Sequence, residues 1–186
     1  MCSSDLRVLK KGQSSWQIPL QGDAWRNFMP GSGEFREPSI TVYPLKADGD
    51  IPPVRTIQGS LTRLNWPAHI AVDVIHNELY VANTVTDEIL VFRATDTGNV
   101  APIRVIKGAH TQLKHPHGVF VDSKNDELVV ANFGNHSATV YRRSAEGDAA
   151  PIRMIRAAPI DTPAPMFGNI GSLAYDTKRD EILVPN

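Results

Sequence analysis

Three polar side chains near recurring prolines are the residues of this chain best suited to chemistry. They lie in Pro67-Ala-His69, in Pro116-His-Gly118 and, close to Pro165, in Phe167-Gly-Asn169. The imidazoles of His69 and His117 and the amide of Asn169 suit the binding of a metal or an oxyanion, or the transfer of a proton. The alternative, which we favour for the histidines, is that they are solvated loop residues.

A second set of candidates recurs identically at the ends of short apolar runs. Its members are Asp73, Asp122 and Asp176. These carboxylates could be calcium ligands, or each could hydrogen-bond its own backbone in a turn, which aspartate does well. An identical residue in every repeat usually serves the repeat. We therefore predict turn residues and no cofactor, with a divalent metal such as calcium as the alternative.

Arginine also recurs, at Arg55, Arg104 and Arg153. The three could bind an anion in concert. Alternatively, each could fork onto a carboxylate or carbonyl of the adjacent repeat, because the guanidinium group suits bidentate hydrogen bonding. We predict the second role, a structural ladder.

These candidates sit in an internal repeat with a period of 49 residues. The matching stretches are Gly49-x3-Pro53-x-Arg55-x-Ile57, Gly98-x3-Pro102-x-Arg104-x-Ile106 and Gly147-x3-Pro151-x-Arg153-x-Ile155. The third copy drifts, because Asp122 and Asp176 are 54 residues apart. This spacing indicates an insertion around 162–172, of the kind that repeat proteins place in loops.

Each repeat predicts four short strands joined by turns rich in Asp, Gly and Asn. The expected strands are 40–43, 53–57, 69–73, 78–83, 118–122, 127–131, 138–142, 151–155, 172–176 and 181–184. No segment has apolar residues at helical spacing over the length of a helix. Four-stranded units that repeat every 40 to 50 residues are typical of propeller blades. The predicted fold is all-β, a partial β-propeller of four-stranded antiparallel blades.

The repeat also resembles known propeller families. Leu113-x-x-Pro116-x-Gly118-Val-x-Val-Asp122, followed by Leu128-Val-Val-Ala-Asn132, resembles the NHL repeat, and Tyr80-Val-Ala-Asn83 is similar to the YVTN repeat. The resemblance covers roughly residues 39–186. It implies a bacterial propeller of about six blades, of which this chain holds about half. It also implies an extracytoplasmic location, and a ligand site at the channel mouth, where His69, His117 and Asn169 would lie.

The chain is divided into three regions by its patterns. Residues 1–6 read as a non-native leader, residues 7–37 as a degraded repeat or loop, and residues 38–186 as propeller blades, two nearly complete and two partial. The last strand stops where its counterpart in the preceding repeat runs on. We therefore expect a fragment whose open blade faces allow self-association.

Composition narrows the function further. The net charge of −1 predicts no nucleic-acid partner, the single cysteine excludes a disulfide framework, and no apolar run is long enough for a transmembrane segment. The chain also lacks a Gly-x-Ser-x-Gly elbow, a His-Glu-x-x-His motif and a phosphate loop. The sequence thus favours a non-catalytic scaffold that binds a protein, glycan or small molecule. The alternative is a metal-assisted lactonase or lyase of propeller fold.

Overall fold

The computed structural model describes residues 37–156, 159, 162 and 170–185. The chain divides into the units Met1–Arg36 and Glu37–Asn186, of which the first lies outside the described residues. The described residues form β-strands and short 3-10 turns and contain no α-helix. No helix among them could span a membrane. The strands are β1 (Ser39–Val42), β2 (Arg55–Gln58), β3 (Pro67–Asp73), β4 (Glu78–Asn83), β5 (Glu88–Arg93), β6 (Arg104–Ile106), β7 (Pro116–Asp122), β8 (Glu127–Asn132), β9 (Ser137–Arg142), β10 (Arg153–Ile155), β11 (Ala174–Asp176) and β12 (Glu181–Leu183).

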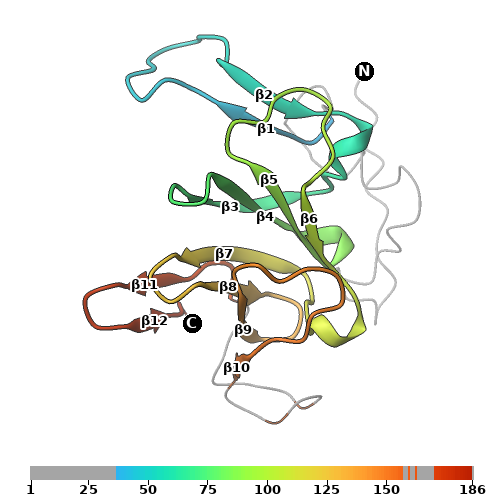
Figure 1. Ribbon diagram of the computed structural model, residues 1–186, viewed down its shortest axis with the longest axis vertical. Coiled ribbons are helices and arrows are strands. Elements are labelled where there is room, and N and C mark those ends of the chain that lie inside the picture. The colour runs from blue at the N-terminus through green and yellow to red at the C-terminus, as the bar shows by residue number, and fades with distance from the viewer. Residues whose placement is uncertain (1–36, 157–158, 160–161, 163–169, 186) are drawn as a thin grey trace, which may run out of the picture. The chain divides into compact units, whose positions relative to one another are not determined.

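The strands form two complete blades flanked by two half-blades (Figure 1). The first blade has the order β3-β4-β5-β6, and the second has the order β7-β8-β9-β10. The hairpin β1–β2 is the leading half-blade, and the hairpin β11–β12 is the trailing half-blade. All pairings within the blades are antiparallel. The predicted all-β fold with four-stranded antiparallel blades is confirmed.

The second strand of the first blade, β4, is buried on both faces, to which its successive side chains point in turn. In β4, Leu79 and Val81 pack toward Ile40 and Ile57 of the leading half-blade. Tyr80, between them, belongs to the core shared with the second blade. This arrangement explains why the sequence shows continuous apolar runs here, where a sheet with one wet face would show strict alternation.

The inner part of the first blade carries an exposed apolar strip. Ile70 and Val72 of β3 are 44% and 54% exposed. Their counterparts 49 residues later, Val119 and Val121, are buried against the first blade. The leading half-blade corresponds to the two outer strands of a blade, so the described residues include no inner strands to cover this strip.

The strands begin later than predicted where prolines precede them. The patterns predicted strands from Pro53 and Pro151, whereas β2 begins at Arg55 and β10 at Arg153. Proline has no N–H with which to continue the ladder. The first hydrogen bond to the neighbouring strand therefore comes from the residue after the proline, as from Ile152 N to the Val140 carbonyl at 2.8 Å.

Candidate functional site

The strands β3, β7 and β11 are the innermost strands of their blades. Each stands at one end of the strand order, and β7 contacts both β3 and β11. In a propeller, innermost strands converge on the central channel, so residues at their ends are candidates for ligand contact.

A β-bulge opens β3 and β7 at equivalent places. In β3, Pro67 pairs with Asn83 and His69 with Ala82, which leaves one extra residue between the two pairs. In β7, the same irregularity lies between Pro116 and Gly118 and makes His117 the extra residue. Bulges commonly re-aim a side chain. The two histidines therefore occupy neighbouring, not equivalent, positions of the repeat. His117 corresponds to Ala68, and His69 corresponds to Gly118.

His69 contacts the neighbouring blade. Its side chain is exposed, and its Nδ1 accepts a hydrogen bond from the Val119 N–H at 3.4 Å, which is long for such a bond. The corresponding Gly118 leaves no such room, because an added Cβ would lie 2.9 Å from Ser172 Cα. One position thus holds a polar side chain at the first junction and requires glycine at the second.

His117 is the more unusual histidine. Its Nδ1 is buried and has no hydrogen-bond partner among the described residues. Its ring packs at a tilt against Phe133, with the ring centroids 5.6 Å apart. Burial lowers the pKa of His117, and the nearby His69 and His115 lower it further. A neutral imidazole at neutral pH is the consequence, with one nitrogen able to accept a proton.

Asn169, the third predicted member, lies outside the described residues. The structure therefore brings two of the three predicted side chains to adjacent innermost strands. Within the described part of the chain, no group of three or more His, Cys, Asp or Glu side chains is placed to hold a metal ion.

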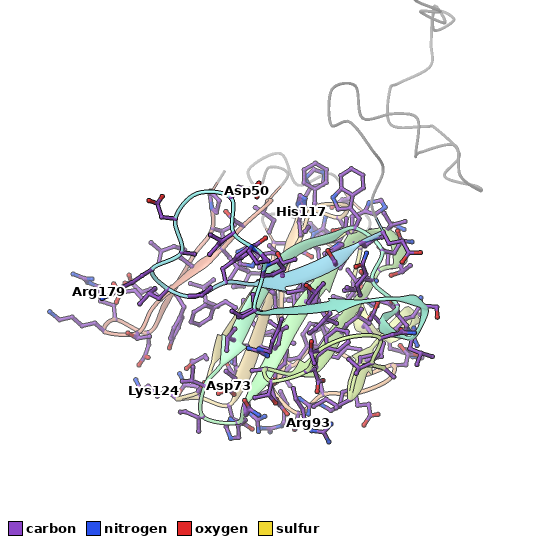
Figure 2. The ribbon with its side chains drawn as sticks, turned by 90° about the horizontal axis from the view of Figure 1, so that it is seen from above. Asp50, Asp73, Arg93, His117, Lys124 and Arg179 are labelled. Carbon is purple, nitrogen blue, oxygen red and sulfur yellow. The ribbon has the colours of Figure 1, made fainter. Side chains whose placement is uncertain are left out.

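The repeated aspartates lie at the other end of the strands from His117, as the labels of Asp73 and His117 in Figure 2 show. Asp73 Oδ1 accepts hydrogen bonds from the N–H groups of Ile75 and His76 at 2.9 and 3.2 Å, and its Oδ2 lies 2.7 Å from His76 Nδ1. Burial raises the pKa of Asp73, but the hydrogen bonds from His76, Ser123 and Ile75 outweigh burial and lower it.

Asp122 and Asp176 make the same turn. Each accepts hydrogen bonds from the N–H groups two and three residues later, at 2.9–3.2 Å. The carboxylate groups at all three positions are thus engaged by their own turns.

Arg104 shows how the arginine ladder is built. Its Nη1 and Nη2 donate to Glu78 Oε1 and Oε2 at 2.6 and 2.8 Å, so the fork binds a carboxylate of its own blade. The same Nη2 lies 3.5 Å from the carbonyl of Arg143 in the next blade. The sequence predicted a carboxylate or a carbonyl of the adjacent blade. The carboxylate belongs to the same blade, because β4 and β6 bring these two side chains together, and the adjacent blade supplies the carbonyl.

The other two arginines each show half of this pattern. Arg153 donates two hydrogen bonds to Glu127 of its own blade, both at 2.6 Å. Arg55 donates to the Ala94 carbonyl of the next blade at 2.7 Å and makes no ion pair within the described residues.

A buried polar network joins the two complete blades, and sequence reasoning missed it. Glu78 accepts hydrogen bonds from Arg104, from the Tyr80 hydroxyl at 2.5 Å and from Arg143 Nη1 at 3.0 Å. These contacts, with Arg104 the largest, lower the pKa of Glu78 to about 2. The sequence signal was a break in the repeat, because the counterpart of Tyr80 is Val129.

Antiparallel four-stranded blades that stack face to face, with adjacent innermost strands, define this protein as a β-propeller segment. The chain belongs to the lactonase family of seven-bladed β-propellers, whose model matches residues 36–163. No curated protein is similar enough to count as a match. The propeller resemblance seen in the sequence is therefore right in class. The family that matches is the lactonase family, with seven blades where the NHL resemblance implied six.

Proposed function

We propose that this chain is a non-catalytic propeller scaffold that binds a small, hydroxyl-bearing molecule at the channel mouth. The carrying observation is the buried Nδ1 of His117, which has no partner among the described residues. A buried polar atom without a partner costs roughly 1–3 kcal/mol, so a ligand hydroxyl that donates to it gains correspondingly.

The chemistry of the mouth favours a small molecule over the protein or glycan partners that the sequence also allowed. His117 presents one half-buried ring, and His69 beside it on β3 is exposed. The buried acceptor of His117 next to the exposed imidazole of His69 suits a small polar ligand of which one end enters the site. The repeated Asp and Arg side chains are engaged within and between the blades, so among the predicted site residues that the structure describes the two histidines remain for a ligand.

A second candidate function is lactone hydrolysis, which the family match favours. In that reaction His117 would act as a general base. It would take a proton from the water that attacks the lactone carbonyl, and the ring would open to the hydroxy acid. The lowered pKa of His117 keeps the required neutral form present at neutral pH. We place the scaffold first because no second acid or base is hydrogen-bonded to His117 Nδ1 among the described residues.

Calorimetry with a sugar-acid lactone and with the ring-opened sugar acid tests both functions. His117→Phe keeps an aromatic ring against Phe133 and removes the nitrogen, so we expect binding to weaken at least about tenfold. His110→Phe is the matched control, because His110 is exposed on a 3-10 turn at Ala109–Thr111. It should bind as the wild type does.

The pH dependence gives a further readout. Binding through neutral His117 should be constant above its ordinary pKa of 6.5 and fall only at more acidic pH, because burial lowers the pKa. Binding without release of acid supports the scaffold. Acid release that His117→Phe abolishes supports the lactonase. No binding of either compound, or equal binding by His117→Phe, contradicts both.

A further inference from the structure

Gly171 lies beside the buried nitrogen of His117. A Cβ added to Gly171 would lie 3.9 Å from His117 Nδ1 and, its chain neighbours aside, would meet no other atom of the described residues within 4 Å. Gly171 itself is exposed, so the unpartnered nitrogen lies just beneath a surface residue. The preceding residue, Ile170, is 1% exposed and packs with Ala131 and Ala138 of the second blade. The second blade therefore holds Gly171 next to His117.

Neither backbone strain nor packing requires glycine at position 171. The φ of Gly171 is not positive, and an added Cβ would stand at ordinary van der Waals distance from its one neighbour. Gly118 is different, because its Cβ would lie 2.9 Å from Ser172 Cα. Gly171 and His117 each lie five residues before the aspartate that ends their strand. This place in the repeat thus accepts a full side chain, and its absence at Gly171 needs another reason.

We propose that Gly171 determines which ligands the site accepts, because its missing side chain lets the terminal hydroxyl of a ligand reach His117 Nδ1. The inference rests on the proposed function, since it concerns the same nitrogen. It goes further by naming the part of the ligand that enters, which is an unbranched end with a primary alcohol. The bare backbone at Gly171 leaves the room that such an end needs.

The chemistry of the nitrogen selects an alcohol over a carboxylate. Burial lowers the pKa of His117, so the ring is neutral at neutral pH, and Nδ1 accepts a hydrogen bond when Nε2 holds the hydrogen. An ionised carboxylate is also only an acceptor, so the two groups would meet without a hydrogen between them. The carboxylate would in addition lose its water. A sugar acid should therefore enter with its hydroxymethyl end and keep its carboxylate in solvent.

Two ligands that differ at one end test this choice. Gluconate ends in a primary alcohol, and glucarate carries a second carboxylate in its place. Calorimetry with the full chain should show gluconate binding at least about tenfold more tightly than glucarate. For His117→Phe the two affinities should agree within about threefold, because the nitrogen that distinguishes the two ends is gone. A preference that persists in His117→Phe would arise elsewhere and would overturn the inference.

A serine at position 171 would act as a built-in ligand. Its Cβ would stand 3.9 Å from His117 Nδ1, so the hydroxyl one bond further on can approach to hydrogen-bond distance. Gly171→Ser should therefore weaken the binding of gluconate at least about tenfold. Gly171→Ala places a methyl group beside the nitrogen and should weaken binding at least about threefold. Ala174→Ser is the matched control, because it adds the same hydroxyl to an exposed residue of β11 and should bind as the wild type does.

Nitrogen NMR of the histidine side chains gives a readout that needs no ligand. In Gly171→Ser the Nδ1 resonance of His117 should move upfield, as expected when an unprotonated imidazole nitrogen accepts a hydrogen bond. In Ala174→Ser it should stay in place. The denaturation midpoint of Gly171→Ser should not fall, because Gly171 has no positive φ and no close contact.

The outcomes separate this inference from the proposed function. Wild-type binding of gluconate that both Gly171 variants leave unchanged overturns the role of Gly171 and leaves the proposed function standing. An Nδ1 resonance that does not move in folded Gly171→Ser also overturns the inference alone. No binding of gluconate or its lactone by the wild type overturns both.

Discussion

The carboxylate of Glu78 should contribute a large, pH-dependent part of the stability of the first blade. It is 11% exposed and receives hydrogen bonds from Arg104, Arg143 and Tyr80. Its pKa is lowered from 4.5 to about 2. At about 1.4 kcal/mol per pH unit, this difference corresponds to about 3 kcal/mol. Glu78→Gln keeps the shape and removes the charge, so the variant should lose about that much free energy of unfolding at pH 7.

The sign of the pH effect follows from the lowered pKa. The contribution of Glu78 is complete above pH 4.5, where the carboxylate is ionised in both the folded and unfolded states. It is lost as the pH falls from 4.5 toward 2, because the unfolded chain takes up the proton first. The difference between wild type and Glu78→Gln, measured by urea denaturation with far-UV circular dichroism, should therefore shrink between pH 5 and pH 2.

The matched control is Glu127→Gln, at the same position of the second blade. Glu127 binds Arg153, whose side chain is 52% exposed, so solvent screens the pair and we expect a loss of about 1 kcal/mol or less. Equal losses in the two variants at pH 7, or a Glu78→Gln difference that persists unchanged at pH 2, would refute the reasoning.

Two further substitutions test how the blades pack, with denaturation midpoints as the measurement. Gly108→Ala should destabilise the protein by roughly 1–3 kcal/mol, because the added Cβ would lie 2.2 Å from Asp148 Oδ1 at a residue with a φ of 144°. In Gly98→Ala the added Cβ meets no atom within 4 Å, so this variant should lose only about 1 kcal/mol through the strain of a positive φ. Equal losses in the two variants would show that the close contact at Gly108 does not matter. Val119→Ala removes a side chain that is 1% exposed and should lower the free energy of unfolding by about 2 kcal/mol. Ile70→Ala changes the equivalent residue of the first blade, which is 44% exposed, and should lower it by less than half as much. A larger loss for Ile70→Ala would mean that the exposed strip of β3 is covered in solution.

The sequence predicted the blades because the repeat and the alternation of apolar residues act together. Leu79 and Val81 had to face one neighbour and Tyr80 the other, and the structure places them so. The strand starts were less predictable at Pro53 and Pro151, where a missing N–H delays the ladder. The hydrophobic pattern is carried by side chains, whereas the start of a strand depends on the first backbone hydrogen bond.

The candidate site was only partly predictable, because a bulge changes which side chain points where. Residue 68 plus one period is 117, so the counterpart of His117 is Ala68, and the step of 49 contained that information. What the period could not show is that His117 Nδ1 is buried, because burial depends on how Phe133 packs beside it. The network around Glu78 was not predicted from the sequence for a similar reason. Its members lie on β4 and β6 of the first blade and directly after β9 of the second. Only Tyr80 and Arg143 depart from the repeat, with Val129 and Ala94 at the corresponding positions.

Departures from the repeat also indicate which junction between blades must differ. A side chain from the next blade accepts a hydrogen bond from a backbone N–H two residues after a glycine, both where the leading half-blade meets the first blade and where the two complete blades meet. Asn99 Oδ1 accepts from Leu61 N at 2.8 Å next to Gly59, and Asp148 Oδ1 accepts from His110 N at 2.7 Å. One period after His110 the sequence has Pro159, which has no N–H to donate. A blade that follows the second blade therefore cannot use this contact.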